Sequence, residues 1–306
     1  MEQKLLLALN IGNTHVSAGV FDFLEKVPAP PENKSPIFEL IHTTRFKTHP
    51  IPKSAALKEL FTSEFSLFPI TTVAVASVVP AFTEILHEVE QSSETGFLSD
   101  FYFIDHLAPF SFVNETDFPE KVGKDRLVNA EAAVRLYGAP CIIVDVGTAT
   151  TFSVIGASNG KPRFLGGAFT PGIRTSMNAI VENTAQLLSV ELAPPPTAIG
   201  KNTQDALQSG ILLGHASLID GMAYRFELEL FSEELRGEEL CGSALGTSRG
   251  GNLSSTCLHL DHKRLPIIAT GGLGSLIAPL CKKITEVQPH LTLKGIAYTY
   301  DTFRKQ

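Results

Sequence analysis

Leu5-Leu-Leu-Ala-Leu-Asn-Ile-Gly-Asn-Thr14 and Cys141-Ile-Ile-Val-Asp-Val-Gly-Thr148 share one design. Each begins with a short apolar run, which is typical of a buried strand. A polar side chain, a glycine and a hydroxyl residue then follow. Glycine lets the backbone approach a ligand closely, and successive N–H groups with a hydroxyl can donate to phosphate oxygens. One such turn occurs by chance, but two in equivalent places predict a pair of phosphate-binding hairpins.

The order of elements around each hairpin is also similar. Three strands come first, and helices and strands then alternate, which is the layout of a ribonuclease-H-like half. Either Asn202 or Thr203 is suited to cap the helix after residue 203. The expected strands are residues 5–9, 15–23, 37–46, 71–79, 101–104, 141–145, 149–155, 163–169 and 266–270, and the expected helices are residues 54–65, 81–90, 125–136, 173–188 and 204–230.

These patterns predict an α/β protein built from two ribonuclease-H-like domains, with mixed sheets flanked by helices. A chain of 306 residues is long enough for two such units. The expected boundary separates residues 1–118, with the first phosphate turn, from residues 119–306, with the second.

Composition narrows the classes of partner. The net charge of −7 argues against a protein that binds nucleic acid or an anionic membrane surface. The four cysteines are far apart and form no C-x-x-C pair, so neither a disulfide framework nor a zinc ribbon is expected. The N-terminal apolar run is too short for a signal peptide, and no stretch reaches the ~18 apolar residues of a membrane span. The expected location is the cytoplasm.

The segment 236–252 is rich in glycine and serine, which predicts a surface loop. Cys257, His259 and His262 follow it in a C-x-H-x-x-H arrangement. A metal site there is one interpretation. A solvated polar loop is the better one, because structural zinc needs a fourth ligand that the sequence does not place.

A third glycine element, Thr270-Gly-Gly272, lies between an expected strand and a short helix. Adjacent glycines there allow an adenine–ribose unit to lie against the backbone, although a helix entry packed under the sheet gives the same pattern. No G-x-x-x-x-G-K-[ST] motif is present and no G-x-G-x-x-G follows the first strand, so a P-loop or Rossmann site is not expected. The order of two phosphate turns and then Thr-Gly-Gly resembles the actin-like sugar kinase and chaperone superfamily.

Further motifs make the resemblance narrower. In chain order they resemble those of type III pantothenate kinases, also called the Bvg accessory factor family. They are Ala76-Ser-Val-Val-Pro80, Val122-Gly-Lys-Asp-Arg126 with Asn129, Asp145-Val-Gly-Thr-Ala-Thr-Thr151, Gly166-Gly-Ala-Phe-Thr-Pro-Gly172, Ile199-Gly-Lys-Asn-Thr203 with Gln208-Ser-Gly210, Ala269-Thr-Gly-Gly272 and Leu291-Thr-Leu-Lys-Gly295.

This resemblance implies an ATP-dependent kinase that phosphorylates pantothenate to 4′-phosphopantothenate for coenzyme A. It implies Mg²⁺ on the nucleotide, a monovalent cation (K⁺ or NH₄⁺) held by Asp145, and a homodimer with Thr203 acting in the neighbouring subunit. Asp125 would be the base that takes the proton from the pantothenate hydroxyl. The implied ATP-binding residues are Asn10, Ile11, Gly12, Asn13, Thr14, His15, Val16, Ser17 and Thr148, and the implied pantothenate-binding residues are Thr116, Gly123, Lys124, Asp125, Arg126 and Thr203.

The residues themselves allow two interpretations of Asp125. It stands near the start of an alanine-rich helix, where a carboxylate interacts favourably with the helix dipole. Without the other motifs it would be an ordinary N-terminal charge with Arg126 as a surface partner. With them, the catalytic role is favoured, since phosphoryl transfer needs a carboxylate near the attacking hydroxyl.

Two positions depart from the family pattern. Asn10 replaces an aspartate, which keeps the size and a carbonyl acceptor but removes a negative charge. Thr116 replaces a tyrosine that the family often offers to the substrate. Two hypotheses follow: a working pantothenate kinase, or a weakly active or inactive homologue with a binding or regulatory role. A sugar or acetate kinase fits the G-x-D-R motif less well.

Overall fold

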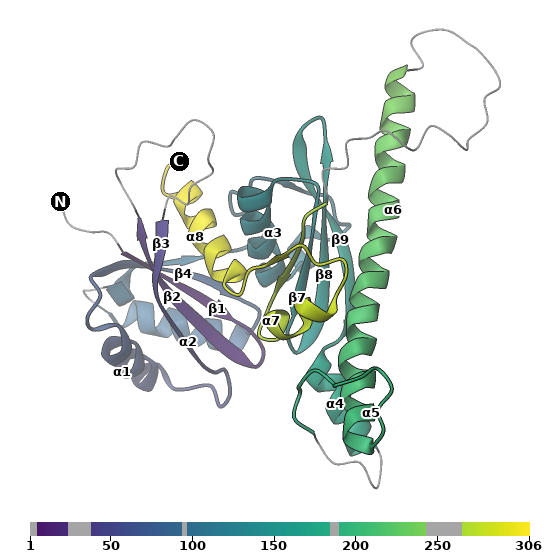
Figure 1. The fold of residues 1–306 in the computed structure, drawn as a ribbon. Helices are drawn as coiled ribbons and strands as arrows, with labels where there is room; N and C mark the ends of the chain where they lie inside the picture. Colours follow the sequence, from purple (N-terminus) through teal and green to yellow (C-terminus); the bar gives the residue numbers. More distant parts are fainter. Residues whose placement is uncertain (1–4, 24–37, 94–96, 184–189, 243–264) are drawn as a thin grey trace.

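The computed structural model describes residues 5–23, 38–93, 97–183, 190–242 and 265–306 (Figure 1). It contains two mixed β-sheets with helices on their faces, so the α/β class with two sheets is confirmed. A hairpin of antiparallel strands forms the centre of each sheet, and a parallel strand pairs with the first strand of each hairpin.

The first sheet has the strand order β3-β2-β1-β4-β5. Its outer face packs on α1 and α2 through an apolar core, in which Leu7 and Val16 of the strands meet Phe61 of α1. The elements are β1 (Leu5–Ile11), β2 (His15–Phe23), β3 (Phe38–Lys47), α1 (Ser54–Phe65), β4 (Ile70–Ser77), α2 (Pro80–Gln91) and β5 (Phe101–Phe103).

The second sheet has the order β11-β10-β7-β8-β9-β6. Its outer face packs on α4 and α6, with Phe152 and Ile219 in the shared core. The elements are β6 (Val113–Asn114), α3 (Lys124–Tyr137), β7 (Cys141–Val146), β8 (Ala149–Ser158), β9 (Lys161–Pro171), α4 (Ile173–Glu182), α5 (Thr203–Gln208), a π-helical segment (Ser209–Leu213), α6 (Gly214–Gly242), β10 (Ile267–Thr270), α7 (Gly274–Ile277), β11 (Glu286–Val287) and α8 (Leu291–Phe303).

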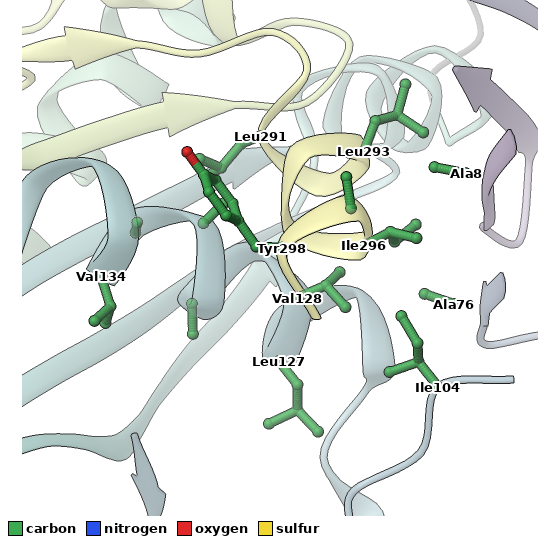
Figure 2. Close-up of a cluster of buried hydrophobic side chains, with 14 of the residues drawn as sticks. Ala8, Ala76, Ile104, Leu127, Val128, Val134, Leu291, Leu293, Ile296 and Tyr298 are labelled. Atoms are coloured by element: carbon green, nitrogen blue, oxygen red, sulfur yellow. The ribbon is translucent and has the colours of Figure 1, made fainter. Parts of the chain in front are cut away.

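Helices α3 and α8 fill the space between the two sheets (Figure 1). Figure 2 shows Leu293 and Ile296 on the side of α8 that points toward Ala8 and Ala76 of the first sheet. The two helices approach closely at Gly295, where a Cβ atom would lie 1.8 Å from the carbonyl oxygen of Val128. The last helix of the chain therefore completes the core between the halves.

Two expectations about the C-terminal half were wrong. The helix expected at 204–230 is divided by the π-helical segment, and α6 continues to Gly242 instead of giving way to a loop at Arg236. The reason is local, because 233–240 is made mostly of glutamate and leucine, which are strong helix formers. The rest of the expected loop, with Cys257, His259 and His262, lies outside the described residues.

Candidate active site

The first phosphate turn joins β1 to β2. The Gly12 N–H donates to the carbonyl of His15 over 3.0 Å, which closes the hairpin. Thr48, directly after β3, supports the turn from behind. Its hydroxyl donates to the carbonyl of Gly12 over 2.6 Å, and its N–H donates to the carbonyl of Thr14 over 3.0 Å. Asn10, one residue before the end of β1, pairs with Ser17 of β2, so the ladder continues up to the turn.

The second phosphate turn joins β7 to β8 in the same way. The Gly147 N–H donates to the carbonyl of Ala149 over 3.1 Å. The carbonyl of Thr148 accepts the N–H of Gly172 over 3.1 Å and the hydroxyl of Thr175 over 2.6 Å. The start of helix α4 therefore fixes the position of this turn.

The structure brings the two turns together. The hydroxyls of Thr14 and Thr148 are hydrogen-bonded at 2.7 Å, although one belongs to each half. Both lie at an exposed position. The hydroxyl groups of both turns therefore lie at one point of the structure.

Asp145 is half-buried near the end of β7, next to Thr270 of β10 in the ladder. The side-chain amide of Asn129 donates to one of its carboxylate oxygens over 3.2 Å. Gly271 covers the other: with φ of 84°, it sits where a Cβ would lie 2.3 Å from Asp145 Oδ1. The pKa of Asp145 is raised to about 6, first by desolvation and then by the negative charge of Asp125, while the hydrogen bond from Asn129 opposes the rise.

Asp125 lies in the first turn of α3, which begins after Gly123. Its carboxylate accepts the N–H of Arg126 over 2.8 Å. Burial raises the pKa of Asp125, and the hydrogen bond and charge of Arg126 oppose that rise. Because the charge of Asp125 is felt at Asp145, the two carboxylates belong to one electrostatic site.

Arg126 is not a surface partner. Its side chain is buried and donates to the carbonyls of Phe152 and Gly166 over 3.0 and 3.1 Å. The guanidinium also lies 4.8 Å from the ring centre of Phe169. Arg126 therefore ties α3 to β8 and β9, and the alternative of a simple surface charge pair at the start of α3 is wrong.

The other expected substrate residues lie at different distances from this centre. Thr116 donates to the side chain of Asn114 over 2.8 Å, beside Gly166. Lys124 is half-buried at the first position of α3. Thr203 is exposed at the start of α5, where Asn202 caps the helix by accepting the N–H of Asp205 over 2.9 Å. No hydrogen bond joins Thr203 to residues 123–126 within the described part of the chain.

Several side-chain oxygens around the site lack a hydrogen-bond partner. Asn10 Oδ1, Asn129 Oδ1 and Thr270 Oγ1 are all buried and unpartnered among the described residues. Asn129 and Thr270 both adjoin Asp145, which makes an oxygen-rich environment that suits a hard cation. Among the same residues no group of three histidine, cysteine or acidic side chains could hold a metal ion. Sequence reasoning noted Asn129 only as part of a motif and missed Thr48, because both act through tertiary contacts.

A cavity of about 330 Å³ opens at the other end of β1 and β4 from the phosphate turns. We place the functional site at the turns, because the convergent polar groups and the two half-buried carboxylates are there and not in this cavity. Its lining residues are Leu5, Leu6, Phe23, Thr71, Tyr300, Arg304 and Lys305.

Two facing strand-turn-strand hairpins, with a glycine turn beside the second, define the actin-like class of ATP-binding proteins. Residues 6–225 match the family model for "Type III pantothenate kinase". The chain belongs to the type III pantothenate kinase family.

Curated relatives support this over nearly the whole chain. A type III pantothenate kinase of Roseiflexus sp. is 32% identical over 308 residues, covering 98% of this chain and 100% of the relative. One from Thermomicrobium roseum is 36% identical over 241 residues, or 79% of each chain. A solved structure of a Baf family protein from Campylobacter jejuni has a TM-score of 0.52 at 16% identity, covering 98% of this chain and 100% of that one, which supports the fold. Within the described residues, no helix is long and apolar enough to cross a membrane.

Proposed function

We propose that this protein transfers the terminal phosphoryl group of ATP to the primary hydroxyl of pantothenate. The product is 4′-phosphopantothenate, the first intermediate on the way to coenzyme A. The observation that carries the proposal is the position of two half-buried carboxylates, Asp125 and Asp145, beside the paired turns. A cytoplasmic location fits an enzyme that uses ATP.

The nucleotide phosphates lie against residues 10–17 and Thr148, with the adenosine toward Gly271 and Gly272. Phosphoryl transfer depends mostly on positioning and charge neutralisation. The N–H groups and hydroxyls of the turns orient the phosphates. The first turn belongs to the half 1–118 and the second to the half 119–306, so each half supplies donors to the phosphates.

Asp125 acts as the general base. Its carboxylate accepts the proton of the pantothenate hydroxyl as the oxygen attacks the terminal phosphorus, and the bond to the ADP oxygen breaks. Burial, which raises its pKa, makes it a stronger base than an exposed aspartate. Gly123, Lys124 and Arg126 surround the substrate, with Thr116 in place of the aromatic side chain that the family often has.

The unpartnered oxygens near Asp145 fit a monovalent cation, K⁺ or NH₄⁺, with Asp145, Asn129 and Thr270 as the holding residues. Bound with the nucleotide, Mg²⁺ supplies positive charge that offsets the charge of the phosphates. Asn10 offers only a neutral carbonyl oxygen to a metal-bound water. A homodimer would bring Thr203 to the site of the neighbouring subunit.

A coupled assay of ADP release tests the proposal, with ATP, Mg²⁺ and K⁺ present and pantothenate, a hexose or acetate as acceptor. We expect turnover only with pantothenate, and a phosphorylated product by mass spectrometry. Turnover with the hexose or acetate, and none with pantothenate, would show that pantothenate is not the substrate.

An Asn10→Asp variant, run beside the natural protein, tests the weakly active alternative. Family membership does not favour that alternative. The natural protein would be an impaired kinase if its turnover were very low and that of Asn10→Asp were about 10²- to 10³-fold faster. This factor is the usual contribution of one preorganised electrostatic partner.

A further inference from the structure

Arg45 extends from the first half to the glycine turn of the second. It lies on β3, paired with Ser17 of β2 next to the first phosphate turn. Its guanidinium lies against Gly272, where an added Cβ would be 3.1 Å from Nη1 and 3.5 Å from Nη2. One cationic side chain therefore adjoins both elements assigned to the nucleotide.

The neighbouring side chains give this face of the sheet a positive charge. His15 and Ser17 flank Val16, which is buried on the opposite face. Lys47 pairs with His15 in the ladder. The pKa of His15 is lowered by burial and then by Arg45 and Lys47, which indicates that both cations lie close to a neutral imidazole.

Among the described residues, no carboxylate forms an ion pair with either cation. Arg45 and Lys47 are exposed, and neither side chain has a hydrogen bond or ion pair with another described residue. Asp125 and Asp145 lie on the second half and do not contact Arg45. Asn10, at the end of β1, is neutral. The face of β2 and β3 beside the first phosphate turn, called here the first-half wall, is therefore cationic, and within the described residues it has no ion-paired carboxylate.

We propose that Arg45 binds the phosphates of the nucleotide from the first-half wall, opposite the donors of the second hairpin, with Lys47 adding charge. A guanidinium presents a planar fork that matches two phosphate oxygens, which a lysine cannot. This inference rests on the proposed placement of ATP between the turns. It adds a residue on β3, outside every motif that predicts the site.

The competing explanation is structural, with Arg45 serving only to hold Gly272 in place. The two explanations differ in their effect on ligands of different charge. A phosphate contact affects ADP and leaves adenosine unchanged, because adenosine has no phosphate. Loss of a structural contact beneath the adenosine affects both ligands alike.

Isothermal titration of ADP and adenosine into the full chain makes the test. For Arg45→Gln we expect the Kd for ADP to rise roughly 10- to 100-fold, the size of a lost charge-assisted hydrogen bond, with the Kd for adenosine within about twofold. The Kd of Arg45→Lys for ADP should lie between those of the natural protein and of Arg45→Gln. Lys161→Gln removes one positive charge from the exposed β8–β9 turn and should bind both ligands normally.

An unchanged ADP affinity in Arg45→Gln, or an equal loss for both ligands, would overturn the inference while leaving the kinase proposal intact. If the natural protein bound no ADP, the nucleotide placement itself and this inference would both fail. Thermal melting of each variant confirms that the binding data come from folded protein.

Discussion

The hydroxyl groups of Thr14 and Thr148 lie 2.7 Å apart, although 134 residues separate them in the chain. They are the last residues of the two related turns, and their contact joins the halves at the point assigned to the phosphates. In the absence of nucleotide each hydroxyl satisfies the other. A bound phosphate would take both as donors, so binding exchanges one internal hydrogen bond for two to the ligand.

Thr14→Ala and Thr148→Ala should each raise the KM for ATP about tenfold, the size of one lost hydrogen bond to a charged group. The double variant should raise the KM by less than the product of the two single increases, because both side chains bind one ligand. Steady-state kinetics at saturating pantothenate measure this. Ser63→Ala, at an exposed hydroxyl on α1, is the control. Full additivity would show that the two hydroxyls act separately.

Asp125→Asn should lower kcat about 10²- to 10⁴-fold, the usual contribution of a general base, while ADP still binds. In the natural protein, kcat/KM should fall as the pH drops through the raised pKa of Asp125, because the base must be ionised. The pH–rate profile measures this. An acidic limb that persisted in an active Asp125→Asn variant would assign that limb to another group.

Asp145→Asn should stabilise the protein above pH 6. Folding raises the pKa of Asp145 from 3.8 to about 6, so the folded state binds the proton more tightly. That stabilisation is complete below pH 3.8 and is lost as the pH rises through 6, which amounts to up to about 3 kcal/mol. The variant should therefore gain in Tm at pH 8 and little at pH 4, as measured by thermal unfolding without added potassium. An equal gain in Tm at both pH values would contradict the link between stability and the titration of Asp145.

Gly295→Ala should destabilise the protein by about 2–4 kcal/mol, because the new methyl group would overlap the backbone of α3 and force the helices apart. Gly221→Ala is its matched control. Gly221 lies inside α6 with nothing within 4 Å of its added Cβ, so alanine there should stabilise by about 0.5–1 kcal/mol. Urea unfolding of both variants measures the pair. Equal effects of the same sign would refute the close approach of α3 and α8.

The local sequence pattern was sufficient to predict most helices and strands of the first half. Helix α1 occupies the expected residues, 54–65, and β2 occupies 15–23, because apolar spacing and turn residues act within short windows. Both phosphate turns were visible for the same reason. Strands β6 and β11, of two residues each, were not predicted, since so short a segment carries no period.

What the sequence did not reveal depends on tertiary contact. The sequence alone predicts Arg126 as a surface charge. Only the fold shows that its guanidinium donates hydrogen bonds to carbonyls of β8 and β9. Arg45 stands in an alternating polar strand with no motif around it, and its neighbour Gly272 is 227 positions away in the chain.

Helix α8 gives the protein a particular order of assembly. Leu6 and Phe38 of the first sheet share a core with Leu293 and Ile296, which are synthesised much later in the chain. Translation proceeds at about 5–20 residues per second, so the inner face of that sheet waits many seconds for its cover. A nascent chain thus carries an unfinished apolar surface until α8 has been made. Any C-terminal truncation that removes α8 leaves that surface open to chaperones and to aggregation.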